Sequence, residues 1–443
     1  MGFPKNFEWG AATASFQVEG GKESRGESVW DLFCRKDGAI AHGHDGAVAC
    51  DHYHRFREDI ALMKKTGIKT YRFSISWPRI LPDGLGKINE EGVLFYNQLI
   101  DALLENGIEP YITLFHWDYP LALYRQGGWL NPQSPDWFAK YTKIIMDLFS
   151  DRVSHWFTLN ENLCFISIGH ANGTHAPGLR LSEEDVMVCA HHSLLAHGRA
   201  VSVIREYAKK TPSVGFAPVG EVKIPASSAP EDIRAAYDAM FQVCTPHYWG
   251  NAIWVDPVMT GYYADGLMDC FKKYHIPVSD DDMRCIGSPI DFLGMNIYVG
   301  ETVGVNGRTR PIPGFDQTMM GWEITPEALY WGPRFYYERY HKPMYITENG
   351  IANLDLVTPD GKVHDPQRAE FLRRYLKCLK QACSEGIDVR GYFQWSLLDN
   401  FEWAEGYQKR FGLIYVDYPT GNRILKDSAL WYHDMIASNG EFI

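Results

Sequence analysis

Short apolar runs rich in β-branched and aromatic residues recur along the 443-residue chain, and longer amphipathic stretches separate most of them. The short runs suit covered strands, whereas the longer stretches repeat their apolar residues with the period of a helix. The pattern therefore predicts strands that alternate with helices. The strands are expected at residues 7–13, 70–76, 109–115, 155–160, 213–218, 291–298, 343–347 and 389–396.

The helical period is clearest at residues 51–68, 91–108, 134–151 and 366–387. Glycines stand directly before the next predicted strand at Gly67, Gly107 and Gly386, as expected for left-handed helix ends. Acidic runs that follow Ser182 and Ser279 are typical of capping boxes and predict two further helix starts.

Alternation of this kind in one unbroken chain predicts an α/β protein, a single-domain (β/α)8 TIM barrel that spans residues 1–443. A doubly wound sheet would leave a visible domain break at this length, and no GxGxxG motif follows the first strand. A long, Gly- and Pro-rich loop is expected at residues 304–321, and long ordered loops are usually functional. In such a barrel, side chains at the C-terminal ends of different strands converge on one pocket.

Composition narrows the choice of partner. A net charge of -12, with no basic stripe, argues against nucleic acid, and no stretch approaches the roughly 18 apolar residues of a membrane span. The N-terminal segment lacks the pattern of a secretion signal, so a cytoplasmic protein is expected. The nine cysteines are scattered without a CxxC pair, and the histidines lack ligand spacing, so neither a metal nor another cofactor is expected.

Chemically capable side chains gather at the predicted strand ends. Most glutamates are solvated surface charges, but two that each end a buried strand at the same face rarely lack a partner or a task. These two are Glu161 and Glu348, and the second precedes an Asn349-Gly350 turn that is expected to lead the backbone away from a ligand. Around them stand Gln17, Arg72, His116, Trp117, Asn160, Asn296, Tyr298 and Trp395.

Paired carboxylates flanked by Trp, Asn, Gln and His are typical of a sugar site, since amides and imidazole bind hydroxyls and indole faces cover the apolar side of a pyranose. Glycosidic cleavage needs one carboxylic acid to protonate the leaving oxygen and one carboxylate to meet the anomeric carbon. No nucleophile elbow or phosphate loop competes with this interpretation. The residues alone do not assign which glutamate takes which role.

Six blocks carry a more specific resemblance, in order along the whole chain: "FEWGAATASFQVEG", "YRFSISWPRI", "HWDYP", "TLNEN", "ITENG" and "WSLLDNFEWAEGYQKRFGLIYVD". They resemble the signature blocks of family 1 glycoside hydrolases, the β-glucosidase family. The resemblance implies a retaining mechanism in which Glu348 is the nucleophile and Glu161 the acid/base, about 5 to 5.5 Å apart. Arg72 and Tyr298 are expected to keep Glu348 ionised, whereas Glu161 holds its proton.

The resemblance also implies a binding site for the non-reducing sugar and its leaving group. The hydroxyls of the sugar are expected to bind Gln17, His116, Asn160, Glu402 and Trp403. Trp395 is expected to form the floor of the sugar site, and Trp322 is expected to lie on the leaving-group side. Glu402 argues for an unphosphorylated substrate, because a carboxylate would repel a phosphate, although Lys409 matches part of the phosphate pattern.

One position departs from the family. Asn162 stands where proline usually follows the acid/base residue, and it is expected to loosen the turn or to hydrogen bond toward the leaving group.

The leading hypothesis is a β-glucosidase for cellobiose and for aryl or alkyl β-glucosides. A broader β-glycosidase that accepts galactosides or fucosides, or a transglycosylase, stays open, because such sugars differ by single hydroxyl contacts. A catalytically silent sugar-binding barrel is the alternative from another class. The expected partner is a small β-glucoside or oligosaccharide, and homo-oligomers are expected only by analogy with other barrel enzymes.

Overall fold

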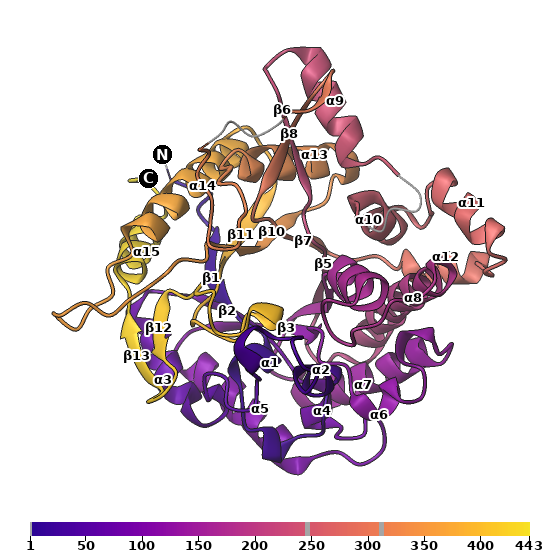
Figure 1. Ribbon diagram of the computed structural model, residues 1–443, viewed down its shortest axis with the longest axis horizontal. Helices are drawn as coiled ribbons and strands as arrows, with labels where there is room; N and C mark the ends of the chain where they lie inside the picture. The colour runs from indigo at the N-terminus through magenta and orange to yellow at the C-terminus, as the bar shows by residue number, and fades with distance from the viewer. Residues whose placement is uncertain (1, 244–248, 310–313) are drawn as a thin grey trace.

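Eight parallel strands close into a barrel in the computed structural model, which describes residues 2–243, 249–309 and 314–443 (Figure 1). Around the barrel the strands follow the order β1-β11-β10-β7-β5-β4-β3-β2, and β1 closes it by pairing with both β2 and β11. Their bounds are β1 Glu8–Ala12, β2 Thr70–Ser74, β3 Glu109–Phe115, β4 His155–Asn160, β5 Ser213–Ala217, β7 Phe292–Asn296, β10 Met344–Asn349 and β11 Val389–Trp395. The predicted barrel and all eight of its strands are confirmed.

Helices surround the barrel and cover its outer face (Figure 1). The four clearest helical predictions are confirmed as α3 His52–Lys65, α5 Glu90–Glu105, α7 Ser134–Phe149 and α14 Pro366–Ser384. The remaining long helices are α8 Glu183–Tyr207, α13 Ala328–Tyr340 and α15 Asp427–Ala437. The other helices are α1 Ser15–Val18, α2 Val29–Cys34, α4 Trp77–Ile80, α6 Leu121–Tyr124, α9 Pro230–Met240, α10 Asn251–Thr260, α11 Asp265–Lys273 and α12 Asp280–Ile286.

Helix ends follow the predicted local chemistry. The side chain of Ser182 accepts a hydrogen bond from the backbone N–H of Asp185 at the start of α8, and Ser279 forms a reciprocal capping box with Asp282 at the start of α12. Gly67, which ends the α3 segment, has a φ of 70°, so this helix stops in the left-handed conformation that glycine favours.

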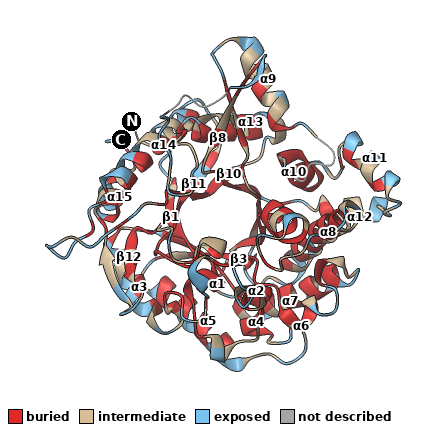
Figure 2. Ribbon diagram, in the orientation of Figure 1, coloured by how far each residue is buried: buried red, intermediate tan, exposed pale blue. Residues whose placement is uncertain are grey.

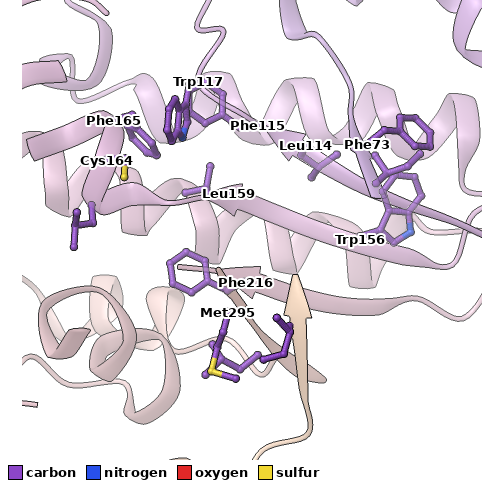
Figure 3. Close-up of a cluster of buried hydrophobic side chains, with 14 of the residues drawn as sticks. Phe73, Leu114, Phe115, Trp117, Trp156, Leu159, Cys164, Phe165, Phe216 and Met295 are labelled. Carbon is purple, nitrogen blue, oxygen red and sulfur yellow. The ribbon is translucent and has the colours of Figure 1, made fainter. Parts of the chain in front are cut away.

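The core lies in two layers, and the strands between them are almost entirely buried (Figure 2). The outer layer packs strands against helices through side chains such as Phe73, Leu114 and Trp156 (Figure 3). A separate aromatic cluster joins Tyr111, Phe157, Phe292, Tyr345 and Phe393, which come from five different barrel strands. Alternation along each strand explains the division, since Trp156 and Phe157 are neighbours in sequence but belong to different layers.

Two small sheets lie outside the barrel and were not predicted from the sequence. β6 (Val222–Pro225), β8 (Gly300–Gly304) and β9 (Gly307–Arg308) form one, and β12 (Ile414–Asp417) pairs with β13 (Asn422–Leu425) in the other. β9 falls within the loop predicted at residues 304–321, of which residues 310–313 lie outside the described part of the chain. Among the described residues, no helix combines the length and apolar character that crossing a membrane requires.

Candidate active site

The C-terminal ends of the barrel strands open into a cavity of about 810 Å³. Its wall includes ten of the thirteen site residues predicted above: His116, Trp117, Glu161, Asn296, Tyr298, Trp322, Glu348, Trp395, Glu402 and Trp403. The other three lie behind the wall, where Arg72 is paired with Glu348 (2.6 Å), Gln17 reaches Glu402 (3.4 Å) and Asn160 reaches His116 (3.2 Å). The thirteen side chains are therefore gathered around one cavity, as expected from their places at strand ends.

Glu348 is buried next to a cation. Arg72 Nη1 lies 2.6 Å from Glu348 Oε1, and the Tyr298 hydroxyl donates a 2.7 Å hydrogen bond to Oε2. Arg72 is held in turn by Asn160 Oδ1 (2.5 Å) and Thr113 Oγ1 (3.2 Å), so its position is fixed. Burial raises the pKa of Glu348, while Arg72 and Tyr298 stabilise its carboxylate and oppose that rise.

Among the described residues, no cation forms a direct ion pair with Glu161. Asn296 Nδ2 donates a 2.7 Å hydrogen bond to Glu161 Oε1 and a 3.0 Å hydrogen bond to Asn160 Oδ1. Burial, together with the negative charge of Glu348, raises the pKa of Glu161 to about 8. The two carboxyl groups thus sit in different electrostatic surroundings, Glu348 beside a cation and Glu161 beside a neutral amide.

Glu402 is a third carboxyl group at this cavity. Its pKa is raised to about 8, first by burial and then by the charges of Glu348 and Glu161. Gln17 Nε2 donates to the Phe401 carbonyl (2.9 Å) and approaches Glu402 Oε2, which fixes the amide beside the carboxyl group. Gln17 Oε1 is buried and has no partner among the described residues.

His116 and tryptophans form the apolar part of the wall. The His116 ring stacks on Trp395 with centroids 5.8 Å apart and an interplanar angle of 17°. Because Asn160 Oδ1 already accepts from Arg72, Asn160 Nδ2 donates to His116 Nε2, and the hydrogen of the neutral imidazole therefore sits on Nδ1. His116 Nδ1 is buried without a partner among the described residues, so an acceptor of a bound ligand fits there.

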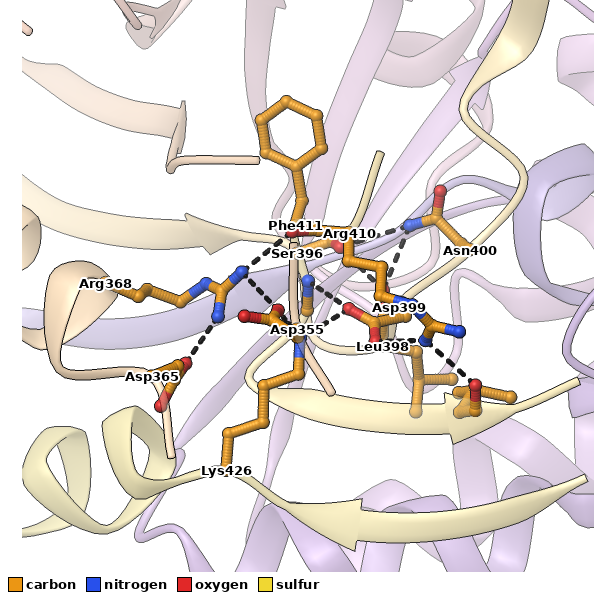
Figure 4. A network of polar contacts seen from close by, with 12 residues as sticks. Asp355, Asp365, Arg368, Ser396, Leu398, Asp399, Asn400, Arg410, Phe411 and Lys426 are labelled. Carbon is orange, nitrogen blue, oxygen red and sulfur yellow. Dashed lines mark hydrogen bonds and ion pairs between the residues drawn. The ribbon is translucent and has the colours of Figure 1, made fainter. Parts of the chain in front are cut away.

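The segment that follows β11 carries Glu402 and Trp403 and is anchored from outside the barrel (Figure 4). Lys426 Nζ lies 2.6 Å from Asp399 and from Asp355, and Arg410 lies 2.7 Å from Asp399. Lys426 and both aspartates are buried, so these ion pairs hold the segment in place without contact with solvent.

Gly350 is needed for a different reason than the predicted turn. It has no left-handed φ, and a Cβ atom at this position would meet the Trp395 carbonyl oxygen at 1.8 Å. The glycine therefore lets the end of β10 pack closely against the end of β11. That the Asn349-Gly350 segment also leads the backbone away from a ligand stays a prediction.

The predicted contact of Asn162 with a leaving group is wrong. Asn162 is fully buried, and its Nδ2 donates a 2.8 Å hydrogen bond to Ser193 Oγ on α8. Its Oδ1 is also buried and has no partner among the described residues.

The charged rim of the cavity was not predicted from the sequence. Lys223 on β6 lies 2.7 Å from Glu301 on β8, and both line the cavity together with Glu221 and Arg308. These residues lie on or next to the small sheet formed by β6, β8 and β9, outside the barrel. The expectation that site residues stand at the ends of barrel strands therefore could not identify them. The short β-branched runs around residues 222–225 and 300–304 are the sequence feature that could have indicated these two additional strands.

Comparisons with known proteins agree with this geometry. The family model described as "Glycosyl hydrolase family 1" matches residues 1–441. Beta-glucosidase A of Thermotoga maritima is 45% identical over 453 residues, covering 99% of this chain and 98% of that protein. Beta-glucosidase A of Acetivibrio thermocellus is 43% identical over 451 residues, covering 99% of each chain. The structure of a beta-glucosidase from Thermotoga maritima in complex with glucoimidazole matches with a TM-score of 0.91 at 44% identity and covers 99% of each chain.

Proposed function

This chain belongs to glycosyl hydrolase family 1, and we propose that it is a retaining β-glucosidase that releases glucose from the non-reducing end of cellobiose and of aryl or alkyl β-glucosides. The names of its relatives, two of them beta-glucosidases, support glucose as the sugar. The observation that carries the mechanism is the contrast between two buried carboxyl groups in one cavity, of which Glu348 pairs with Arg72 and Glu161 has no direct cation.

In the first step, a Glu348 carboxylate oxygen forms a bond to the anomeric carbon while the bond from that carbon to the leaving oxygen breaks. Glu161 donates its proton to the leaving oxygen, so the aglycone departs as a neutral alcohol. In the second step, Glu161 takes a proton from water, and the water oxygen attacks the anomeric carbon and displaces Glu348. Two inversions leave glucose in the β configuration and return both carboxyl groups to their starting protonation states.

Surrounding groups set these roles before the substrate arrives. Arg72 and Tyr298 favour the carboxylate form of Glu348, so the proton that the pair shares resides on Glu161. Once the glycosyl-enzyme has formed, the charge on Glu348 is gone, and Glu161 becomes easier to ionise because its largest like-charge neighbour has been removed. The same residue therefore serves as an acid first and as a base afterwards.

The remaining wall residues fit a glucosyl unit. The unpaired atoms Gln17 Oε1 and His116 Nδ1 offer one acceptor and one donor to hydroxyls, and Trp395 offers its face to the sugar ring. Asn160, held between Arg72 and His116, is assigned to the 2-hydroxyl, where hydrogen bonding strengthens in the transition state. Trp403 is assigned to the upper hydroxyls.

The distal hydroxyls and the leaving group are assigned to other parts of the wall. Glu402 at the cavity wall favours hydroxyls over a phosphate, and Lys409 is bound to the Met319 carbonyl at 2.6 Å. Trp322, which lies 5.3 Å from the Tyr298 ring, is assigned to the leaving-group side.

A fluorosugar experiment tests the reaction and the nucleophile together. The protein is incubated with a 2-deoxy-2-fluoro-β-glucoside that has a good leaving group, and intact mass and a peptide map are then recorded. One fluoroglucosyl adduct on the peptide that contains Glu348 is expected. Absence of an adduct together with measurable glucose binding would contradict the proposal and favour a silent sugar-binding barrel, and an adduct on another carboxylate would overturn the assignment of roles.

Glu348→Gln is the matching variant, since it keeps the shape of the side chain but removes the nucleophilic charge. Turnover is expected to vanish while glucose binding persists. Unchanged turnover would refute the role of Glu348.

A further inference from the structure

Glu161 sits on a backbone conformation that few residues other than glycine adopt. Its φ is 51°, in the left-handed region, immediately after β4 ends at Asn160. Its N–H donates to the Ala217 carbonyl at 2.8 Å, and its own carbonyl accepts from the Cys164 N–H at 2.9 Å. Such a conformation persists only where the surroundings hold it, and the direction of the Glu161 side chain depends on this turn.

Two buried polar links tie this part of the chain to α8, one on each side of Glu161. Before it, Thr158 Oγ1 lies 2.6 Å from His197 Nδ1, and after it, Asn162 Nδ2 donates to Ser193 Oγ at 2.8 Å. Residues 193 and 197 are four apart, so they lie on the same face of α8. The pair of links therefore sets the register of α8 against β4 and the turn that follows.

The Ser193 hydroxyl can accept a hydrogen bond from Asn162 because its own hydrogen is donated elsewhere. Its hydroxyl donates to the Ala190 carbonyl within α8 at 2.8 Å, which leaves an oxygen lone pair for Asn162 Nδ2. Ser193 and Asn162 are both fully buried, and Asn162 Oδ1 has no partner among the described residues. A buried amide that is half unpaired costs stability, so its presence beside a strained turn needs an explanation.

We infer that Asn162 and Ser193 form a positioning pair that holds the Glu161 turn and so aims the carboxyl group of the acid/base residue. This inference rests on the proposed function. Asn162 touches neither the cavity nor the carboxyl group, and it acts only through the backbone of its neighbour. Cys164, whose backbone N–H donates to the Glu161 carbonyl at 2.9 Å, belongs to the same turn.

The chemistry of the leaving group separates this role from a merely structural one. A dinitrophenolate leaves without help from an acid, whereas the alkoxide of an alkyl glucoside or of cellobiose needs the proton of Glu161. A misdirected Glu161 therefore slows cleavage of poor leaving groups selectively. A general loss of folded protein lowers the rates of all substrates by the same factor.

The test compares kcat/KM of the parent, Asn162→Ala and Ser193→Ala on 2,4-dinitrophenyl β-glucoside and on cellobiose. Because kcat/KM reports the first step, it isolates acid catalysis from the later attack of water. For each variant we expect a loss of about 10- to 100-fold on cellobiose, in line with a misplaced catalytic group, and little change on the dinitrophenyl substrate. The double variant is expected to lose no more than Asn162→Ala alone, since both residues make one link.

Ser202→Ala is the control for the loss of a serine hydroxyl from an exposed position of α8. Ser202 also lies on α8 and also donates to a carbonyl of its own helix, that of Gly198 at 3.2 Å, and among the described residues it makes no hydrogen bond to the Glu161 turn. Its kcat/KM is expected to match that of the parent on both substrates. If Asn162→Ala fails to fold, Ser193→Ala decides the question, because it removes only one hydroxyl.

Two results would overturn the inference. One is an equal loss on both substrates, and the other is no loss on cellobiose. A parent that cleaves neither substrate would instead refute the proposed function, and the inference with it.

Discussion

Tyr298→Phe isolates one of the two groups that stabilise the Glu348 carboxylate. The Tyr298 hydroxyl donates a 2.7 Å hydrogen bond to Glu348 Oε2, and its ring packs 5.3 Å from Trp322. Phenylalanine keeps the ring and removes only the donor. The Arg72 pair with the other oxygen, Oε1, stays intact, so the nucleophile loses one hydrogen bond and keeps its cation.

The size of the effect follows from the type of bond. A hydrogen bond to a charged group contributes about 1.5–3 kcal/mol, and one pKa unit corresponds to about 1.4 kcal/mol. Because the bond stabilises the charged form, its removal raises the pKa of Glu348 by about one to two units. The nucleophile reacts only when ionised, so the acid limb of the pH profile moves to higher pH, and activity below that limb falls by about 10- to 100-fold.

The measurement is kcat/KM on 4-nitrophenyl β-glucoside across both limbs of the pH profile. Tyr432→Phe serves as the control, because the Tyr432 hydroxyl donates to the Gly10 carbonyl at 2.8 Å and contacts no carboxyl group of the site. An acid limb that stays in place in Tyr298→Phe, or moves equally in both variants, would refute the reasoning. Glu161 and Glu348 influence each other's ionisation, so each limb of the pH profile reports an apparent pKa of the pair. The comparison between variants is therefore a comparison of apparent pKa values.

Three further outcomes are expected. Since the pKa of Glu161 is about 8 and the acid must be protonated, kcat/KM falls as pH rises through about 8, and Glu161→Gln abolishes that alkaline limb in a pH profile. Glu402→Gln weakens transition-state binding by about 0.5–1.5 kcal/mol at pH 7, because Glu402, with a pKa of about 8, is mostly protonated there and the amide lacks its acidic hydroxyl donor, and kcat/KM on glucosides against the parent measures this loss. Lys426→Met removes the cation that Asp355 and Asp399 share and leaves each with a single arginine, Arg368 or Arg410, which lowers the free energy of unfolding by about 1–3 kcal/mol in urea titrations, and an unchanged midpoint would contradict it.

The sequence predicts most of the barrel because strand and helix periods are independent of distant contacts. It also predicts the residues that end a strand, such as Asn160 and Glu348, since a barrel brings all strand ends to one face. The assignment of roles to Glu161 and Glu348 came from the resemblance and not from the pattern. Trp322 and Glu402 likewise lie in segments between strands, where no periodicity indicates which way a side chain faces.

Other features could not be predicted, because they depend on contacts between distant segments. Nothing local in the sequence shows that Asn162 faces α8 and not the cavity, since its partner Ser193 lies 31 positions away. Gly350 also looks like a turn residue until its neighbour across β10 and β11 is known. Lys223 and Glu301 meet only because β6 and β8 pair across a long excursion from the barrel.

The pairing of β1 with β11, which closes the barrel, means that the barrel cannot close until late in synthesis. β1 is synthesised first, but its partner β11 ends at Trp395, which stands opposite Ala12 in the parallel register. Until that strand leaves the ribosome, the barrel is an open sheet with two unpaired edges, and the wall that contains Trp395 is missing. Contacts of such long sequence separation form slowly, so the emerging chain spends its synthesis without a cavity and exposed to edge-to-edge aggregation. A chain that is interrupted before β11 would lack activity altogether, however well its first ten strands had formed.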